Sequence, residues 1–323
     1  MTNPMENTAD GSIAPTATPT KMQAWYRATR PRVFVASFVP MGIAAMLAIE
    51  DGVFNPLFFV LSLLGVMFLQ TTANLVNEYA DFYRGADELK EAGQGMAIKK
   101  MGLTPKEVLW GAIFSTVAGS LIGLFLLSQS GPLLWAIGIG GVLVAITYTA
   151  GPFPLAYHGL GEAAAGIFMG PMIVLGAYYV MQPEISSERL LQIILVSFPV
   201  MFTTAAILHA NNIRDLEADK SVNKRTLAVM FGREGARIEY KLLLAACYLS
   251  QVIVVILGWM PVTTLITLMT IPAARRLAHI FDTETATGPL HAAQGGTAKL
   301  HGQIGLLTVI GWLVWLVAKP LIG

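Results

Sequence analysis

The sequence predicts an all-α, polytopic membrane protein whose nine transmembrane helices pack into a single bundle. Of its 323 residues, 54% are hydrophobic and only 13% are charged, and the mean hydropathy is +0.61. This composition is too apolar for a water-soluble chain of such length. Nine apolar runs have the length of about 17 to 25 residues that crosses a hydrocarbon core. They lie at residues 33–49, 54–76, 107–128, 132–150, 160–181, 189–209, 240–259, 261–280 and 303–321.

The distribution of Lys and Arg orients these spans. Cytoplasmic loops of membrane proteins collect basic residues. With the amino terminus inside, all of the 21 Lys and Arg residues except Arg189 and Lys319 fall on the inner side. The sequence therefore predicts a multi-pass protein with a cytoplasmic amino terminus. Residues 1–21 are polar and have neither a basic head nor an apolar core, so we expect a disordered tail before an integral membrane domain over 22–323.

Two of the predicted spans end in acidic and amide residues on the same, cytoplasmic side. The second span leads into "QTTANLVNEYADFYRGADELK" (70–90), and the sixth leads into "NNIRDLEADKSVNKRTLAVMFG" (211–232). If both helices continue through these stretches, residues three and four apart share a face. The first stripe then consists of Asn74, Asn77, Glu78 and Asp81, and the second of Asn211, Asn212, Asp215 and Asp219.

The two stretches also match one another. Asn77 and Asp81 align with Asn211 and Asp215 at one common offset, which corresponds to four spans. This suggests that spans one to four and five to eight are related halves, with the ninth span added. A cytoplasmic-side active site between the halves follows from that arrangement.

Two acidic stripes that face each other at the edge of a membrane need compensating charge, because a carboxylate within a span costs roughly 2.5–3.5 kcal/mol. A divalent cation would supply it, and carboxylate and amide oxygens suit Mg²⁺. The basic residues that follow would hold a phosphate group beside the metal. Alternatively, Asn and Asp only cap the helices and the basic residues only reflect topology. Two stretches with matching spacing on one side favour the metal site.

These stretches resemble the two aspartate-rich motifs of the UbiA-type intramembrane prenyltransferases. "NEYADFYRGAD" (77–87) looks like the first motif, and "NNIRDLEAD" (211–219), continued by "KRTLAVMFG" (224–232), looks like the second. Three further stretches are similar to the branch of the family that prenylates 1,4-dihydroxy-2-naphthoate in menaquinone biosynthesis. They are "KKMGLTPKEV" (99–108), "YTAGPFPLAYHGLGE" (148–162) and "TAKLHGQIGLL" (297–307).

The resemblance implies a Mg²⁺-dependent enzyme of the bacterial cytoplasmic (inner) membrane. Such an enzyme transfers a polyprenyl group from a polyprenyl diphosphate to 1,4-dihydroxy-2-naphthoate, releases diphosphate and CO₂, and gives demethylmenaquinol. Its other partner is membrane lipid, and we expect no nucleic acid. Three alternatives stay open: another aromatic acceptor such as 4-hydroxybenzoate, a cation-coupled transporter, and a structural subunit.

Carried over residue by residue, the resemblance assigns the roles at the site. The metal ligands are Asn77, Glu78, Asp81, Asp87, Asn212, Asp215 and Asp219. The diphosphate-binding residues are Arg84, Lys99, Arg214, Lys220, Lys224 and Arg225. The catalytic residues are Asp81, Asp215, Tyr148 and Glu162. Glu78 stands where the family usually has Asp, and its longer side chain would shift a bound ion.

Four residues near the motifs have two interpretations each. Tyr148 is a candidate for binding the diphosphate or shielding an allylic cation, but an interfacial tyrosine has the same pattern. Glu162 is a candidate for orienting the acceptor or receiving its proton, although the dipole of the following helix also favours an acid there. His209 either reaches the cavity or is hydrogen-bonded to a neighbour. Pro171 predicts a kink in the fifth span.

Overall fold

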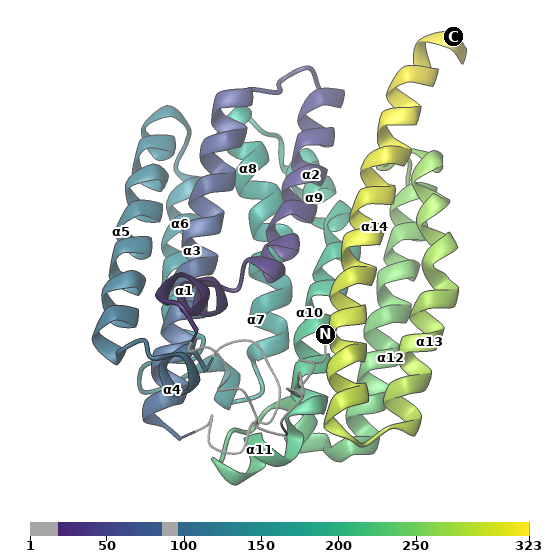
Figure 1. Cartoon of the computed structure of the whole chain (residues 1–323). Helices are drawn as coiled ribbons and strands as arrows, with labels where there is room; N and C mark the ends of the chain where they lie inside the picture. Colours follow the sequence, from purple (N-terminus) through teal and green to yellow (C-terminus); the bar gives the residue numbers. More distant parts are fainter. Residues whose placement is uncertain (1–18, 86–95, 323) are drawn as a thin grey trace, which may run out of the picture.

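The computed structural model describes residues 19–85 and 96–322, and the regular structure of these two ranges is helical (Figure 1). In chain order the α-helices are α1 (Lys21–Thr29), α2 (Val35–Glu50), α3 (Pro56–Tyr83), α4 (Ala97–Met101), α5 (Pro105–Gln129), α6 (Leu133–Thr147), α7 (Gly161–Ile167), α8 (Ile173–Met181), α9 (Ser187–Val196), α10 (Phe198–Arg214), α11 (Leu216–Ser221), α12 (Leu227–Ile256), α13 (Ile271–Thr283) and α14 (Thr287–Ile322). Shorter helices of other types are η1 (Pro31–Phe34), η2 (Leu155–Tyr157), η3 (Phe168–Met172) and η4 (Val262–Thr270). The all-α prediction is confirmed.

Within the described residues, seven helical segments are long and apolar enough to cross a membrane. They are Lys21–Glu50, Pro56–Tyr83, Pro105–Gln129, Gly161–Met181, Ser187–Arg214, Leu227–Ile256 and Thr287–Leu321. Each coincides with one of the nine predicted spans. The other two predicted spans are also helical, but α6 has only 15 residues, and η4 with α13 is interrupted by Arg275 and Arg276.

The helices form one bundle in which α10 lies near the centre (Figure 1). It packs against α7 on one side and against α12 and α14 on the other. Helices α3, α5 and α6 form the opposite flank of the bundle, where α3 packs closely against α5. The motif-bearing ends of α3 and α10 both point toward the end of the bundle that carries α4 and α11.

The helix between Gly161 and Met181 is interrupted as predicted. It changes to π geometry over η3, which contains Pro171. Proline lacks an N–H for the helical hydrogen bond and clashes with the preceding turn, so it forces such an interruption. The resulting irregular segment lies beside α10 and contributes Phe168 and Met172 to the cavity described below.

The second acidic stripe differs from the prediction because the helix does not continue through it. Helix α10 ends at Arg214, and Asp215 has non-helical dihedral angles (φ −93°, ψ 12°) before α11 begins. The first stripe, in contrast, lies wholly within α3. Beyond the break, Asp219 is buried and does not line the cavity, whereas Asn212 does.

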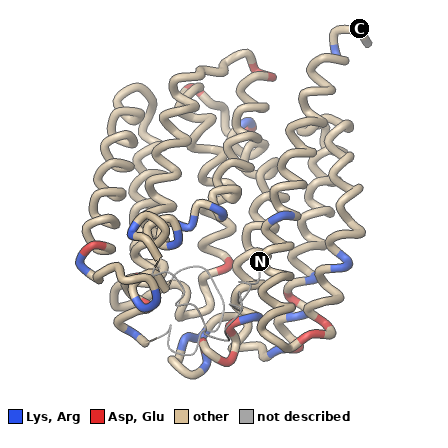
Figure 2. Tube along the Cα trace, in the orientation of Figure 1, with Lys and Arg blue, Asp and Glu red and all other residues tan. Residues whose placement is uncertain are grey.

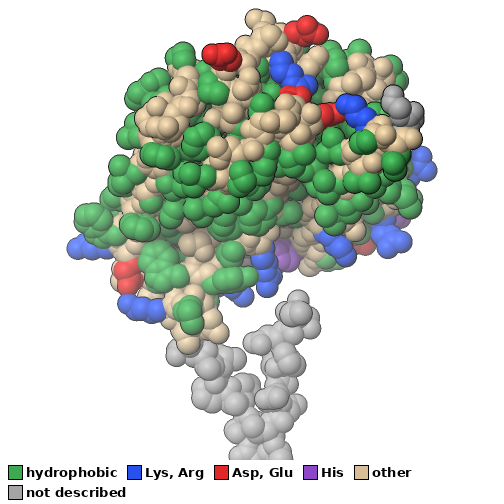
Figure 3. Space-filling view, turned by 90° about the horizontal axis from the view of Figure 1, so that it is seen from above, with side chains coloured by type: hydrophobic (Ala, Val, Ile, Leu, Met, Phe, Trp, Pro, Cys, Tyr) green, Lys and Arg blue, Asp and Glu red, His purple; other side chains and the backbone are tan. Residues whose placement is uncertain are grey.

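Charged residues gather in the half of the bundle that contains α1, α4 and α11 (Figure 2). Seen from the opposite end, hydrophobic side chains lie across the middle of the surface, and a few charged side chains gather along one side of it (Figure 3). One of the two basic residues predicted outside, Arg189, lies at that end and is paired: its Nη2 donates to Asp51 Oδ2 at 2.6 Å. Tyr178 donates to the same carboxylate oxygen. Pairing with Asp51 lowers the free-energy cost of placing the Arg189 charge at that surface.

Candidate active site at the charged end of the bundle

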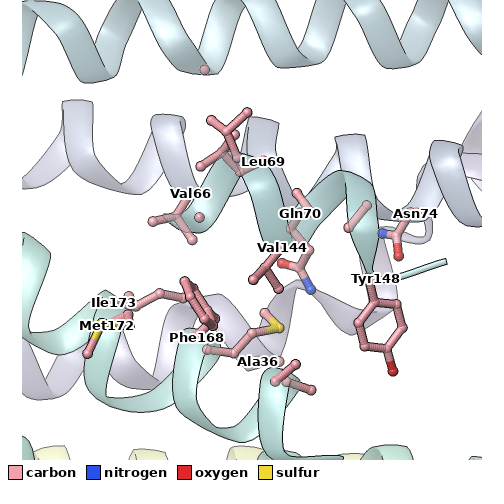
Figure 4. Close-up of a pocket in the computed structure, with 18 of the residues that line it drawn as sticks. Ala36, Val66, Leu69, Gln70, Asn74, Val144, Tyr148, Phe168, Met172 and Ile173 are labelled. Carbon is pink, nitrogen blue, oxygen red and sulfur yellow. The ribbon is translucent and has the colours of Figure 1, made fainter. Parts of the chain in front are cut away.

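A cavity of about 680 Å³ runs into the bundle from its charged end. Helices α3, α5, α6, α8 and α10 contribute most of its walls, together with α7 and η3. Figure 4 shows Asn74 and Tyr148 at one end of the cavity, whereas Met172 and Ile173 lie at the other. The cavity therefore has a polar end and a long apolar continuation.

The polar end is built from both motifs. Asn77 and Asp81 come from the last turns of α3, and Asn212, Arg214 and Asp215 come from the end of α10. Lys224, after α11, and Tyr148, after α6, complete this group. Two segments more than a hundred residues apart in the chain thus bring carboxylates, amides and cations to one opening.

Arg30, which lies between α1 and η1 and outside both motifs, joins this polar end. Its Nη2 donates a hydrogen bond to Asn77 Oδ1 at 2.9 Å and lies 3.9 Å from Glu78 Oε2. Arg30 has a left-handed backbone (φ +54°) and precedes Pro31. Such a conformation is uncommon for a residue with a side chain and is often found at functional sites. The turn directs the guanidinium group into the cavity.

Glu78 and Asp219 lie in the walls of the site rather than on the cavity surface. Glu78 is buried, and its Oε1 accepts the backbone N–H of Ile98, at the start of α4, at 3.1 Å. Asp219 is fully buried and lies 3.2 Å from Lys224 Nζ. The ion pair holds the Lys224 ammonium at the rim of the cavity. Direct metal binding by Glu78 and Asp219 remains a prediction.

Arg214 and Asp215 are bound to each other at the end of α10. Arg214 Nε and Nη2 donate to the two carboxylate oxygens of Asp215 at 2.7 and 2.6 Å. Arg214 Nη1 also donates to His291 Nδ1 at 3.1 Å. A two-point pairing of this kind fixes the plane of the carboxylate. It also holds one cation and one anion side by side in the cavity wall.

A buried network stands directly behind Asn212. Its amide Nδ2 donates to Glu162 Oε1 at 2.7 Å, and His209 Nδ1 lies 3.0 Å from the same oxygen. The other imidazole nitrogen, Nε2, lies 2.8 Å from the carbonyl oxygen of Ala236. Because a carboxylate can only accept, the Nδ2 of Asn212 must face it, and its Oδ1 is the atom left to face the cavity. The network therefore fixes the orientation of the Asn212 amide.

The same network brings Glu162, His209 and Glu239 close enough to hold a metal ion, with their ligand atoms within 4.8 Å of one another. Both nitrogens of His209 are already engaged by oxygen acceptors. A nitrogen that donates a hydrogen has no lone pair for a metal. The arrangement fits a hydrogen-bonded imidazole better than a metal centre.

Arg84 binds the loop between α6 and α7, beside the cavity. Its Nη1 and Nη2 donate to the carbonyl oxygens of Thr149 and Gly151, and its guanidinium carbon lies 4.6 Å from the centre of the Tyr157 ring. Burial raises the pKa of the Tyr157 phenol, and the Asp81 carboxylate raises it further, partly offset by Lys224 and Arg84. Tyr157 therefore stays neutral at physiological pH and presents a ring to both cations.

The remaining predicted residues lie away from the cavity surface. Lys99, Lys220 and Arg225 are exposed and do not line it. Asp87 lies outside the described residues. Their roles as diphosphate or metal ligands stay predictions.

The sequence interpretation did not single out Arg30, Gln70 or Gln294, which are polar and line the cavity. Gln70 lies one helical turn before Asn74 on α3 and so extends the first stripe, which means that the helical period could have found it. Arg30 and Gln294 reach the site only through tertiary packing.

Comparison with known proteins identifies the family. The model of the UbiA prenyltransferase family matches residues 37–288. The chain is 32% identical over 308 residues to 1,4-dihydroxy-2-naphthoate octaprenyltransferase of Bacillus subtilis, covering 95% of this chain and 97% of that protein. It is 34% identical over 251 residues to the protein of the same name from Haemophilus influenzae, covering 74% and 80%.

The fold also matches a solved structure. A UbiA homologue from Archaeoglobus fulgidus bound to DMAPP and Mg²⁺ superimposes with a TM-score of 0.63 at 15% identity. The match covers 89% of this chain and 99% of that one. At this identity the likeness concerns the fold, while the family model and the relatives carry the assignment. The chain belongs to the UbiA prenyltransferase family.

Proposed function

We propose that this protein transfers a polyprenyl group from a polyprenyl diphosphate to 1,4-dihydroxy-2-naphthoate, with release of diphosphate and CO₂, to give demethylmenaquinol. The observation that carries the proposal is the single cavity in which both motifs meet at a polar end and an apolar channel continues from it. A polyprenyl diphosphate is divided in the same way, because its diphosphate is polar and its long hydrocarbon tail is apolar. The names of the two bacterial relatives support the naphthoate as acceptor.

The donor set at the polar end fits Mg²⁺. The carboxylates of Asp81 and Asp215 and the amide oxygens of Asn77 and Asn212 are hard oxygen ligands, which Mg²⁺ prefers. Asn212 is oriented with its Oδ1 free to bind, as the contact with Glu162 requires. When bound there, the metal would neutralise charge on the diphosphate oxygens. Metal binding by Glu78, Asp87 and Asp219, which the family resemblance implies, stays a prediction.

The cations of the chain stabilise the leaving group. Arg30, Arg214 and Lys224 all line the polar end. Negative charge grows on the diphosphate as the allylic carbon–oxygen bond breaks, and fixed cations in a poorly solvated site lower that barrier. The guanidinium groups suit diphosphate because each presents several N–H donors in a plane.

The rest of the cavity protects and positions the reacting carbons. Bond cleavage leaves an allylic cation, which water would capture, and the apolar walls exclude water. The Tyr148 ring lies at the polar end of the cavity and would shield the cation there. The ring carbon that bears the carboxylate attacks the cation; a carbon–carbon bond forms, and the electrons of the broken bond to CO₂ restore aromaticity.

The proposal also places the protein in a membrane. The polar end would face the cytoplasm of a bacterium, because the Lys and Arg residues gather in that half of the bundle (Figure 2). Helix α6 and the segment formed by η4 and α13 would add two spans to the seven long ones, giving nine. The concentration of charge at one end does not suit a cation-coupled transporter, which needs access from both sides.

Catalysis by purified protein tests the proposal directly. The protein in nanodiscs is incubated with octaprenyl diphosphate, 1,4-dihydroxy-2-naphthoate and Mg²⁺, and prenylated product and CO₂ are followed by mass spectrometry. We expect product with the naphthoate, loss of product with EDTA, and recovery with added Mg²⁺. Product with 4-hydroxybenzoate but not with the naphthoate would replace the proposed acceptor. Absence of product with both acceptors, from folded protein, would reject the reaction.

Arg30 provides a test of diphosphate binding. We expect Arg30→Ala to raise the KM for the diphosphate by about tenfold or more, because a charge-assisted hydrogen bond of about 1.5–3 kcal/mol is lost. Arg30→Lys keeps the charge but not the planar donors, so its KM for the diphosphate should lie between those of wild type and Arg30→Ala. Arg27→Ala serves as the control, because Arg27 is exposed on α1 and does not line the cavity. An unchanged KM in Arg30→Ala would show that Arg30 serves only to hold Asn77.

A further inference from the structure

Two basic residues lie at the same level on neighbouring helices at one flank of the bundle. Helices α13 and α14 are joined by a short turn, so they run antiparallel, and they pack against each other (Figure 1). Gly296 of α14 lies against α13, because a Cβ atom at this glycine would lie 2.6 Å from Leu277 Cδ2. Arg276 precedes Leu277 by one residue, and Lys299 follows Gly296 by three. At about 1.5 Å per residue, the two basic residues lie within about 3 Å of one level.

Both basic residues face the same, outer side of this helix pair. Successive residues of an α-helix turn by about 100°. Arg276 therefore lies about 100° round α13 from the contact with α14, and Lys299 lies about 60° round α14 from the contact with α13. In antiparallel helices these two rotations lead to the same side, and both residues are exposed. Arg275, which is also exposed, lies about another 100° round α13, on the side away from α14.

The depth of this pair in a membrane follows from the charges of α14. Between Lys299 and Lys319 the helix contains no charged residue. These two lysines lie about 30 Å apart along the helix, and a hydrocarbon core is about 30 Å thick. Lys299 and Arg276 would therefore lie where the hydrocarbon core meets the lipid head groups, in the leaflet at the charged end of the bundle.

Exposed apolar side chains continue from both basic residues toward the opposite end of the bundle. On α14, Leu306 and Ile310 follow Lys299 at helical spacing and are exposed. On the neighbouring segment, Met269 of η4 precedes Arg276 by about two turns and is 75% exposed. The surface thus presents cations at one level and an apolar strip beyond them. A phospholipid has the complementary arrangement, because its phosphate is charged and its acyl chains are apolar.

The two cations are not neutralised by acidic residues of their own helices. Helix α14 contains no Asp or Glu, and the acid of α13, Asp282, is paired with Lys241 at 3.1 Å. Within residues 19–85 and 96–322, neither Arg276 nor Lys299 forms an ion pair or a side-chain hydrogen bond. Basic residues between membrane helices at this depth bind the head groups of anionic lipids.

We propose that Arg276 and Lys299 together bind the phosphate of an anionic phospholipid, whose acyl chains lie along the exposed apolar residues of η4 and α14. The guanidinium group supplies planar N–H donors, and the ammonium group supplies a second positive charge. A zwitterionic lipid also has a phosphate, but its own cation would lie near two others. Neither basic residue lines the cavity, so this site is separate from the proposed active site and does not depend on the reaction.

The test places a fluorescent label beside the site. Gln303 is exposed on α14, one turn beyond Lys299, and the single cysteine of the chain, Cys247, is buried. Gln303→Cys can therefore be labelled selectively with bimane. The labelled protein is reconstituted into phosphatidylcholine nanodiscs that contain increasing fractions of nitroxide-labelled phosphatidylglycerol or nitroxide-labelled phosphatidylcholine, and quenching is measured. We expect half-maximal quenching at an about tenfold lower fraction of the phosphatidylglycerol.

Substitutions in the labelled protein decide whether the two cations form the site. Arg276→Gln combined with Lys299→Gln should remove the preference for phosphatidylglycerol. Arg275→Gln is the matched control, because it removes the same charge from the other side of α13 and should keep the preference within about threefold. Equal loss in Arg275→Gln would show a general attraction by surface charge and would overturn the site. Absence of a preference in the labelled protein, or a preference that the double variant retains, would also overturn it. Thermal unfolding checks that each variant is folded.

Discussion

Replacement of Asp81 or Asp215 by Asn should lower kcat by about 10³-fold or more, the scale on which a charged or oriented group stabilises a transition state. Asn keeps the size of the side chain and removes only its charge. Both aspartates line the polar end, and Asp81 is 3% exposed. In either variant the site would lose one of the carboxylates that would hold the metal beside the diphosphate. Single-turnover rates with saturating Mg²⁺ would measure the effect on the chemical step.

The control for charge loss alone is Asp282→Asn. Asp282 forms an exposed ion pair with Lys241 at 3.1 Å, far from the cavity lining. Exposed pairs of this kind contribute about 0–1 kcal/mol to stability, so turnover and melting temperature should stay close to wild type. Folding of the Asp81 and Asp215 variants is checked by size-exclusion chromatography and thermal unfolding. Near-normal turnover in both folded variants would contradict the proposal that Asp81 and Asp215 form a metal site.

The sequence predicted most of the fold because hydropathy is a direct consequence of the membrane as solvent. Seven predicted spans coincide with seven long helices. The α6 region was predicted as a 19-residue run, yet the helix ends at Thr147. Hydropathy records where residues are apolar, and the turn from Tyr148 to Tyr157 is apolar as well. The helix ends shortly before Gly151, which has a positive φ of +85°, and Pro152, and Arg84 then donates to the carbonyl groups of Thr149 and Gly151.

The break after α10 was equally difficult to predict. The stretch "NNIRD" contains neither Gly nor Pro, so no local signal ends the helix at Arg214. The structure instead pairs Arg214 with Asp215 and with His291 from a distant helix. Asp219 is then turned toward Lys224. The contact between Arg214 and His291 joins segments that lie far apart in the sequence, and a helical period cannot represent such a contact.

The assignment of cations shows the same limit. Arg84 was assigned to the diphosphate because it follows the first motif, but it binds the carbonyl groups of Thr149 and Gly151. Arg30, which lies 47 residues before Asn77, takes a place beside it. Arg30 lines the cavity and Arg84 does not, so proximity to the motif did not identify this arginine, and diphosphate binding by Arg84 stays a prediction. The motif residues Asn77 and Asp81 were found because one helix carries them at a spacing that is fixed locally.

Removal of Glu162 should weaken Mg²⁺ binding although Glu162 does not line the cavity. Glu162 accepts a hydrogen bond from Asn212 and thereby directs the Asn212 Oδ1 toward the cavity. Groups that orient a metal ligand in this way typically change metal affinity or activity by about 10–100-fold when mutated. We therefore expect Glu162→Ala to raise the Mg²⁺ concentration for half-maximal turnover by about 10–100-fold. A magnesium titration of turnover at saturating diphosphate measures this Mg²⁺ concentration.

The stability of Glu162→Ala separates this positioning effect from a general loss of structure. His209 is fully buried and would lose the acceptor for its Nδ1, so the free energy of unfolding should fall by about 3–5 kcal/mol. Glu162→Gln retains an oxygen that Asn212 can donate to, and its Mg²⁺ midpoint should lie between wild type and Glu162→Ala. Glu239→Gln weakens a contact to His209 at 3.7 Å without touching Asn212. We expect Glu239→Gln to alter stability but to leave the Mg²⁺ midpoint unchanged, whereas Glu162→Ala shifts that midpoint. This pair of results would show that Glu162 acts through Asn212. Equal midpoints in all folded variants would show that Asn212 does not hold the metal.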